Sequence, residues 1–428
     1  MSFYRITKSE INGQIEVPPS KSHTLRAILF AAMAKGKSVI RNYLPSPDAL
    51  AMIAACRLFG ADIQVFDQHL EIKGIEGNIR FTEDVIQAGN SGIVLRFIAA
   101  LASLSSTYTV ITGDQSIRHQ RPMQPLLDAL TQLGAFAVSA RGDGFAPVLL
   151  RGPWQISTVT VVGEDSQPVS ALLIAAAFRK QPTEIYVTKP GEQAWVLLTL
   201  DWFEKLGISY ENHEFEKFYI HGSAHYEGFE YTVPADLSSV AYPIAAALIT
   251  NSELQLNNID MHDIQGDKVL IYELQKMGAN IDIDYDEHKL TIKQNSKLQG
   301  KEIDINTFID GVTILAVLGC YAEGETRIIN AAVARQKECD RLQAITSELR
   351  KMGADIIENV DNLVVRHSAL KGADLFSYND HRMVMSLSVA ALGASGDSKI
   401  GPVECVSKTY PNFAHTFKKA GAKIEVVP

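Results

Sequence analysis

A short pattern that recurs six times limits what this chain can fold into. Each copy has the polar end of a helix, a glycine, usually an alanine, and then residues that alternate between apolar and polar. The glycines are 68 to 75 residues apart and are Gly60, Gly134, Gly207, Gly278, Gly353 and Gly421. Each fits the position after a helix where the backbone needs a positive φ angle. A structural repeat of about 70 residues therefore runs through the whole chain.

A second pattern recurs in the same register, in which a polar residue precedes a helix rich in alanine, leucine, isoleucine and valine. These polar residues are Ser22, Ser91, Ser166, Ser238, Asp310 and Asp380. In the first copy, Ser20 or Ser22 can cap the helix and Gly36 can end it. The later helices are expected over 93–102, 169–177, 240–249, 312–320 and 383–394. Because they are apolar on nearly all sides, we expect them to be buried.

Each repeat thus reads as strand, buried helix, strand, amphipathic helix, glycine turn and strand, which predicts an α/β (α+β) fold. Six repeats could stack as a solenoid or group into two globular domains of three. The second arrangement is favoured because about 210 residues suits one hydrophobic core. We expect one domain over 18–233, a second over 1–17 plus 234–428, and a hinge near 17–19 and 232–235.

The composition argues against several classes of protein. A net charge of −9 is unlike that of a nucleic-acid binder. The four cysteines show no C-x-x-C pair and no zinc spacing, so reduced thiols are expected. Residues 1–17 are polar and charged, which predicts no signal peptide, and apolar runs such as 169–178 are too short to span a membrane. We therefore expect a cytoplasmic protein without membrane or nucleic-acid partners.

Cations collect at the expected starts of the buried helices. They are Lys21, Arg26, Arg96, His381 and Arg382. A helix start already carries partial positive charge, so a cation there is unfavourable unless an anion binds beside it. Solvated surface charge is the alternative for the cations, and repeat symmetry alone explains the capping residues. If two domains of three repeats face each other, their six helix starts would form a cleft suited to a polyanion.

Two glycine-rich or basic segments add to this hypothesis. Gly89-Asn90-Ser91-Gly92 offers bare backbone N–H groups at a helix start, where they can approach an anion closely. The run 118–122 contains Arg121 and is otherwise explained as a surface turn, with Pro122 at the first position of the next helix.

Three later segments carry candidates for anion binding and proton transfer. The run 335–341 is either a solvated charge run or an arginine clamp beside a carboxylate, Glu338. Asp380 next to His381 at a helix start could form an acid/base pair. Lys408 lies in a late basic loop.

Several catalytic motifs are absent from the sequence. The segment 36–38 lacks the upstream glycine of a phosphate-binding loop, because residue 31 is alanine. There is no G-x-G-x-x-G, no G-x-S-x-G and no histidine spacing for a metal, so we expect neither cofactor nor metal. The residues alone predict a cytoplasmic enzyme that binds two anionic small molecules in an interdomain cleft.

The order of these motifs matches a known family. They are Pro19 to Ser22 with Arg26, Gly89 to Gly92 with Arg96, Arg121-Pro122, Ser166-Gln167, Asp236 with Ser238-Ser239, Asp310, Lys337-Glu338 with Asp340-Arg341, Asn379 to Arg382, and Lys408. On these residues the chain resembles the enolpyruvyl transferases from end to end, most closely the branch that uses shikimate 3-phosphate. The resemblance implies a two-domain inside-out α/β barrel, with three βαβαββ repeats per domain around buried parallel helices.

The resemblance also implies a reaction. The enolpyruvyl group of phosphoenolpyruvate would move to the 5-hydroxyl of shikimate 3-phosphate, on the route to chorismate and the aromatic amino acids, by addition and elimination without metal. The expected partners are these two substrates, and the chain is expected to be a monomer. The residues carried over for phosphoenolpyruvate are Lys21, Gly92, Arg121, Gln167, Arg341, Arg382 and Lys408. Those for shikimate 3-phosphate are Lys21, Ser22, Arg26, Ser166, Gln167, Asp310 and Lys337. Those for proton transfer are Asp310 and Glu338, helped by Lys21 and His381.

Some positions depart from the family pattern, chiefly on the acceptor side. Asp165 stands where a serine commonly binds the shikimate phosphate. An acid there would repel that phosphate unless a cation intervenes or the side chain turns away. Val333 stands where asparagine is sometimes found, Trp195 where an aromatic residue or histidine is usual, and Ile93 where threonine is usual.

Two other functions were weighed against this one. The first is a related enolpyruvyl transferase that acts on UDP-N-acetylglucosamine. The Lys-Ser pair at 21–22, the motif at 379–382 and the lack of a cysteine over 114–121 disfavour it. The second is a non-catalytic binding protein that kept the fold, which the intact Glu338 and its neighbouring cations disfavour.

Overall fold

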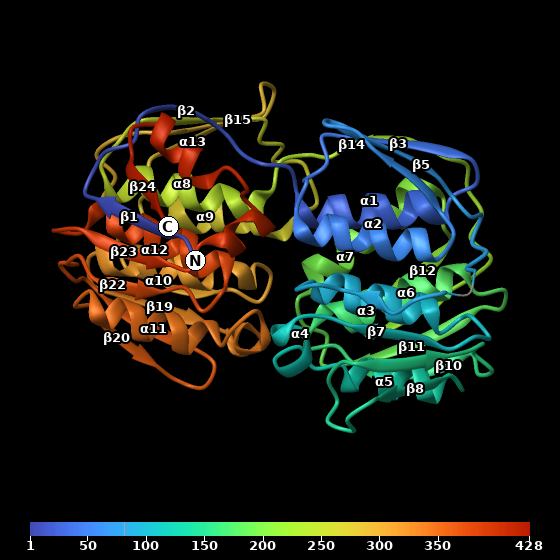
Figure 1. Cartoon of the computed structure of the whole chain (residues 1–428). Coiled ribbons are helices and arrows are strands. Elements are labelled where there is room, and N and C mark those ends of the chain that lie inside the picture. Colours follow the sequence, from blue (N-terminus) through green and yellow to red (C-terminus); the bar gives the residue numbers. More distant parts are fainter. Residues whose placement is uncertain (81) are drawn as a thin grey trace. The chain divides into compact units, whose positions relative to one another are not determined.

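The computed structural model describes residues 1–80 and 82–428, and the backbone divides into two compact units (Figure 1). Residues 19–233 form the first, which we call the N-unit. Residues 1–18 and 234–428 form the second, the C-unit. The chain passes from one unit to the other at Pro18/Pro19 and at Val233/Pro234. That each unit is a separate domain and that these crossings form a hinge stay predictions.

Three four-stranded sheets of one design make up the β-structure described in the N-unit. The first is β14 (Glu230–Thr232), β3 (Lys37–Arg41), β5 (His69–Lys73) and β4 (Asp62–Val65). The second is β6 (Ile86–Gln87), β7 (Thr109–Thr112), β9 (Val148–Arg151) and β8 (Phe136–Ser139). The third is β10 (Thr158–Val162), β11 (Thr183–Thr188), β13 (Lys217–Ile220) and β12 (Tyr210–His213). In each, the first two strands are parallel and the later pairings are antiparallel.

The C-unit repeats this design three times. Its first sheet is β2 (Gly13–Glu16), β15 (Leu254–Asn257), β17 (Lys289–Ile292) and β16 (Ile281–Asp284). The second is β18 (Glu302–Asp304), β19 (Glu325–Ile329), β21 (Leu363–Arg366) and β20 (Asp355–Glu358). The third is β22 (Asp374–Phe376), β23 (Ser398–Gly401), β1 (Phe3–Thr7) and β24 (Lys423–Val427). Because β1 and β2 complete two of these sheets, the first strands of the chain belong to the C-unit. The six-fold repeat and the α/β class are thereby confirmed.

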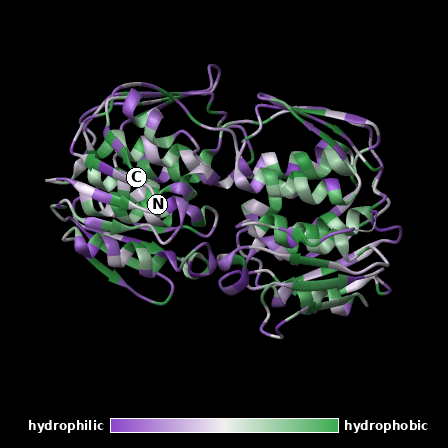
Figure 2. Ribbon diagram, viewed as in Figure 1, coloured by the Kyte–Doolittle hydropathy of each residue, from purple (hydrophilic) through white to green (hydrophobic). Residues whose placement is uncertain are grey.

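Six buried helices form the centre of the two units. They are α1 (Lys21–Met33), α3 (Gly92–Ala102) and α6 (Ser166–Phe178) in the N-unit, and α8 (Leu237–Ile249), α10 (Val312–Tyr321) and α12 (His381–Gly393) in the C-unit. At most two residues of each escape burial. Figure 2 shows apolar colour along these helices and polar colour on the surrounding loops. Their hydrophobicity on all sides therefore did indicate burial.

Amphipathic helices cover the buried ones. They are α2 (Pro47–Leu58), α5 (Gln124–Gln132), α7 (Gln193–Leu206), α9 (Val269–Lys276), α11 (Arg341–Lys351) and α13 (Phe413–Lys419). A glycine with φ between 67° and 111° follows each, at the six positions read from the sequence. A short helix α4 (Gln115–His119) and the 3₁₀ turns η1 (Gly266–Lys268), η2 (Ile309–Gly311), η3 (Ala332–Gln336) and η4 (Glu404–Lys408) complete the described elements.

Ser20, Ser91 and Asp380 cap their helices as expected, whereas the caps of α6 and α8 lie one or two positions before the expected Ser166 and Ser238. The side chains that cap inner helices are Ser20, Ser91, Asp165, Asp236 and Asp380. The first turns of these helices therefore contain Ser22, Ser166 and Ser238. The side-chain oxygen of the capping residue before each of them already accepts from a backbone N–H of that turn. No side chain caps α10, and Asp310 lies in the turn η2 before it.

Two expected helix boundaries are wrong. Helix α1 ends at Met33, because Ala34 is already extended, and Gly36 takes its positive φ of 83° in the turn before β3. Pro122 is not the first residue of α5, which begins at Gln124 after Met123. Across the part of the chain that the structure describes, no helix combines the length and the apolar character needed to cross a membrane.

Candidate functional site

Acids and bases from four segments converge in the C-unit. The acids are Asp310, Glu338 and Asp380, and the cations are Arg341, Arg382 and Lys408. The four segments are η2, residues 338–341 at the start of α11, residues 380–382 at the start of α12, and η4. We call these six residues the C-unit cluster. All six were singled out in the sequence, at helix starts, in a charged run or in a basic loop, but only the fold shows which of them contact one another.

Arg341 is the centre of the C-unit cluster. Its guanidinium donates from Nη1 to Asp310 Oδ1 at 2.6 Å, from Nη2 to Glu338 Oε2 at 2.6 Å and from Nε to Asp380 Oδ2 at 2.8 Å. Only 1% of the Arg341 side chain is exposed. Burial by itself lowers the pKa of Arg341, but the three carboxylates outweigh it and raise that pKa well above its ordinary value. The planar guanidinium carries five N–H donors, so this one cation can hydrogen-bond to all three carboxylates.

Glu338 lies between two cations. Its Oε1 accepts from Lys408 Nζ and its Oε2 from Arg341 Nη2, both at 2.6 Å. The residue is 6% exposed, so these charge-assisted bonds hold the carboxylate in one position. A carboxylate fixed beside two cations that bind anions is suited to proton transfer on an anionic ligand.

Arg382 extends the cluster toward α8. Its Nη2 donates to Asp310 Oδ2 at 2.6 Å and to Ser238 Oγ at 2.9 Å. Burial lowers and Asp310 raises the pKa of Arg382, and the net shift is upward. Close by, burial and then Asp310 raise the pKa of the Asp267 carboxyl well above its ordinary value. Asp267 was not expected from the sequence. The only feature that could have marked it is the Gln265-Gly266 turn before it.

Within the described part of the chain, one group of residues has a spacing suited to a metal ion. Ligand atoms of Glu338, Asp380 and His381 lie within 4.8 Å of one another. Both carboxylates already accept from Arg341, and Glu338 also from Lys408. Because these cations offset the negative charge that would attract a metal ion, we assign no metal to this group.

The four cysteine thiols are held protonated. Burial raises the pKa of Cys56, Cys320 and Cys405 to about 12, and burial and Asp380 raise that of Cys339. Unfolded thiols have a pKa of about 8.5, so the protection should be greatest between about pH 8.5 and pH 12. At pH 9 we expect iodoacetamide to modify the native chain far more slowly than the guanidinium-unfolded chain. Mass spectrometry of each cysteine peptide checks this, and rapid native labelling of any one would contradict it.

A second cluster forms in the N-unit around Arg96. Arg96 donates from Nη1 to Gln167 Oε1 at 2.7 Å and from Nη2 to the Pro122 carbonyl at 2.9 Å. A Cβ atom built on Gly92 would lie 2.9 Å from Arg96 Nη1, 3.1 Å from Gln167 Oε1 and 3.9 Å from Arg121 Cζ. The structure thus brings Gly92, Arg121 and Gln167 together, and a Cβ at the start of α3 would require Arg96 or Gln167 to move.

Asp165 has a cation beside it, which is the condition under which an acid at this position need not repel a phosphate. Asp165 Oδ2 lies 3.3 Å from Arg96 Nη2, and its Oδ1 accepts from the Gln167 backbone N–H at 3.0 Å. A further acid, Glu192, was missed in the sequence. Its Oε2 accepts from the backbone N–H of Ser166 at 3.0 Å and from Ser166 Oγ at 3.1 Å. We call Arg96, Asp165, Ser166, Gln167 and Glu192 the N-unit cluster.

Arg26 is buried among neutral groups. It is 3% exposed, and its Nε and Nη2 donate to Thr199 Oγ1 at 3.1 and 2.9 Å. Its Nη2 also donates to the Trp195 carbonyl, and its guanidinium lies 5.1 Å from the Phe97 ring centre. Burial lowers the pKa of Arg26 to about 9. Among the described residues no carboxylate forms an ion pair with it, so this cation is available to an anionic ligand.

The remaining expected residues lie in the same two units, near the starts of the helices. Lys21 is the first, partly exposed residue of α1, and Ser22 follows it and is buried. Lys337 is 7% exposed and precedes Glu338, and His381 is buried at the start of α12. Val333, by contrast, packs against the hydrophobic core of the C-unit.

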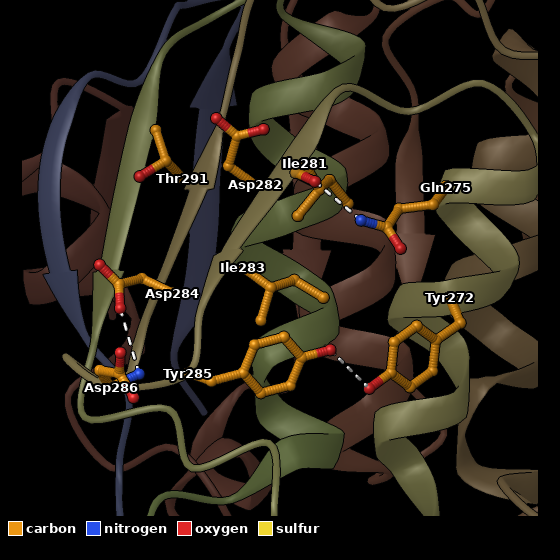
Figure 3. Close-up of a pocket in the computed structure, with 9 residues that line it drawn as sticks. All are labelled: Tyr272, Gln275, Ile281, Asp282, Ile283, Asp284, Tyr285, Asp286 and Thr291. Atoms are coloured by element: carbon orange, nitrogen blue, oxygen red, sulfur yellow. Dashed lines mark hydrogen bonds between the residues drawn. The ribbon is translucent and has the colours of Figure 1, made fainter.

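A separate cavity of about 820 Å³ lies beside α9 and the strands β16 and β17 (Figure 3). Its lining residues are Tyr272, Gln275, Ile281, Asp282, Ile283, Asp284, Tyr285, Asp286 and Thr291. Three of them are aspartates and none of those described is a lysine or arginine. A surface of this sign repels phosphates and carboxylates, and it shares no residue with either cluster.

Comparison with known proteins agrees with this arrangement. A model of the family EPSP synthase (3-phosphoshikimate 1-carboxyvinyltransferase) matches residues 6–417. The chain belongs to the EPSP synthase family. A 3-phosphoshikimate 1-carboxyvinyltransferase from Acetivibrio thermocellus is 43% identical, over 98% of each chain. One from Chlamydia caviae is 44% identical, over 99% of this chain and 95% of the relative.

Solved structures agree on the fold. An EPSP synthase from Acinetobacter baumannii superposes with a TM-score of 0.82 at 26% identity and covers 100% of both chains. The enolpyruvyl transferase NikO from Streptomyces tendae has a TM-score of 0.79 at 19% identity, covers 100% of this chain and 99% of its own, and is a likeness of fold alone. The resemblance to the enolpyruvyl transferases and the fold that it implied are therefore confirmed.

Proposed function

We propose that this chain transfers the enolpyruvyl group of phosphoenolpyruvate to the 5-hydroxyl of shikimate 3-phosphate and releases phosphate. Membership of the EPSP synthase family supports this reaction over transfer to UDP-N-acetylglucosamine. The observation that carries the chemistry is Glu338, a buried carboxylate fixed between Lys408 and Arg341. A carboxylate held in one position beside anion-binding cations can transfer protons to and from a bound anion, which a protein that only binds ligands does not require.

The phosphoenolpyruvate residues supply the positive charge that this substrate needs. They are Lys21, Gly92, Arg121, Gln167, Arg341, Arg382 and Lys408. Arg341 and Arg382 present planar donor forks suited to carboxylate or phosphate. Gly92 leaves room for an anion beside the guanidinium of Arg121 and the amide of Gln167.

The acceptor residues are Lys21, Ser22, Arg26, Ser166, Gln167, Asp310 and Lys337. Arg26 supports this role best, because it is a buried cation without a described carboxylate partner. Asp310 already accepts from Arg341 and Arg382, which hold its carboxyl in position to accept the proton of the acceptor hydroxyl.

The reaction then runs in two steps. In the first, Glu338 in its protonated form gives its proton to the methylene carbon of phosphoenolpyruvate, the acceptor oxygen bonds to the adjacent carbon, and Asp310 takes the hydroxyl proton. In the second, the new methyl group returns a proton to Glu338, the carbon–oxygen bond to phosphate breaks, and phosphate leaves with the proton that Asp310 had taken. Lys21 and His381 assist these transfers, and the cations of both clusters stabilise the tetrahedral intermediate.

Phosphate release tests the proposal. The chain should release phosphate from phosphoenolpyruvate when shikimate 3-phosphate is present, and much more slowly with UDP-N-acetylglucosamine. No turnover with either acceptor would favour the binding-protein alternative. We further propose that the chain is a monomer in the cytoplasm, a reducing compartment that suits its four free cysteines. Light scattering after size-exclusion chromatography would reveal any larger assembly.

Replacing Gly92 by alanine should raise the KM for phosphoenolpyruvate roughly ten- to hundredfold, because a misplaced amide or guanidinium orients the substrate poorly. The added methyl would lie 2.9 Å from Arg96 and 3.1 Å from Gln167, so one of them must move. Steady-state kinetics with phosphoenolpyruvate as the varied substrate gives the answer. Thermal unfolding of the variant serves as control, since the change should not unfold the N-unit. An unaltered KM would show that Gly92 lies away from the substrate.

A further inference from the structure

The start of α6 already holds an anion that belongs to the chain. Glu192 Oε2 accepts from both the backbone N–H and the Oγ of Ser166, at 3.0 and 3.1 Å. Glu192 is 2% exposed, so its carboxylate is desolvated and these donors are committed to it. A helix start with a serine hydroxyl is a natural phosphate site, and here a side chain fills it.

The backbone holds Glu192 in this position at a conformational cost. Its φ of 45° and ψ of 38° are left-handed, a conformation that is unfavourable for a residue other than glycine. The preceding Gly191 packs against the loop before α6, where a Cβ would lie 2.8 Å from the Glu164 carbonyl. Its N–H also donates to the Gly163 carbonyl at 2.9 Å. The two loops are thus joined, and Glu192 is directed onto Ser166 by backbone packing.

Two acids lie close to Ser166 beside the guanidinium of Arg96. Asp165 pairs with Arg96 at 3.3 Å. Burial lowers the pKa of Arg96, Asp165 and Glu192 oppose that shift, and Arg121 adds to it, so all three neighbours act on this guanidinium. A phosphate dianion that reached Ser166 would meet like charge at close range.

Resting on the proposed function, we infer that the Glu192 carboxylate is an internal anion that takes both hydrogen bonds of Ser166 in the ligand-free chain. The phosphate of the acceptor must displace it to bind there. Glu192 is then a specificity residue, because its charge opposes a phosphorylated acceptor and leaves an unphosphorylated one unaffected. If Glu192 served only to satisfy the buried donors of Ser166, its charge would not discriminate between the two.

The variant Glu192→Gln separates these roles. Glutamine keeps the size of the side chain and an oxygen that can accept from Ser166, but it removes the charge. Titration calorimetry of the full chain with shikimate 3-phosphate and with shikimate gives the two dissociation constants. We expect the Kd for shikimate 3-phosphate to fall at least about fivefold and that for shikimate to change less than about twofold. The matched control is Glu164→Gln, an exposed acid on the neighbouring loop that pairs with Lys189.

An unchanged or weakened affinity of Glu192→Gln for shikimate 3-phosphate would overturn the inference, and so would an equal gain for shikimate. Binding is measured apart from turnover, so the two proposals fail separately. Turnover with shikimate 3-phosphate but no tighter binding by the variant rejects only the role of Glu192. Tighter binding without turnover rejects only the proposed function.

A crystal structure of the unaltered chain with shikimate 3-phosphate provides a test that does not depend on a variant folding. We expect the Glu192 carboxylate to have left Ser166, with a phosphate oxygen in its place. If both hydrogen bonds from Ser166 to Glu192 persist with the phosphate bound, the inference is wrong.

Discussion

Replacing Glu338 by glutamine should lower kcat about 1,000-fold, within the range that general acid–base catalysis contributes. Glutamine fills the same volume but cannot give and take back a proton. Arg341 keeps its bonds to Asp310 and Asp380 in this variant, so the cluster should stay folded. Steady-state phosphate release at saturating substrates measures the effect, because kcat then reports the bound complex rather than affinity.

The matched control for this prediction is Glu287→Gln. Glu287 is an exposed acid that pairs with Lys289 at 3.1 Å, outside both clusters. Its kcat should stay within about twofold of the unaltered chain, as expected for a surface substitution. If Glu338→Gln has the same kcat as this control, the proton-transfer role belongs to another group, and Asp310 would be the next candidate.

Replacing Arg341 by methionine should destabilise the C-unit by about 3–5 kcal/mol, the usual cost of removing one partner from a buried charge network. The change leaves the carboxylates of Asp310, Glu338 and Asp380 without their shared cation. Urea unfolding followed by circular dichroism measures the loss. Tryptophan fluorescence provides an internal comparison, because Trp154, Trp195 and Trp202 all belong to the N-unit.

Arg335→Met is the control for Arg341→Met. Arg335 also pairs with two acids, Asp340 at 2.7 Å and Glu358 at 2.8 Å, but its side chain is 24% exposed. We expect a loss of about 1 kcal/mol or less, because exposed pairs contribute little. Equal losses in the two variants would show that the buried network around Arg341 contributes no more to the free energy of unfolding than the partly exposed ion pairs of Arg335.

The repeated architecture could be predicted from the sequence because its signals are local. A glycine such as Gly278 reports a positive φ angle by its identity alone, and a helix such as α10 reports burial by its uniform hydrophobicity. Cations such as Arg382 at helix starts pointed to anionic ligands for the same reason, since they oppose the local helix dipole. These signals lie within one or two turns of chain, so a single sequence contains them in full.

The pairings within each cluster were decided by the tertiary structure. Asp380 and Arg341 are 39 residues apart, and Glu192 and Ser166 are 26 apart, so no local pattern relates them. Each pair forms because separate repeats or loops end at neighbouring points of one unit. The sequence by itself determined the repeat, the buried helices and the residue types at their starts. Which acid neutralises which cation was left to the fold, because a charge interacts through space and not along the chain.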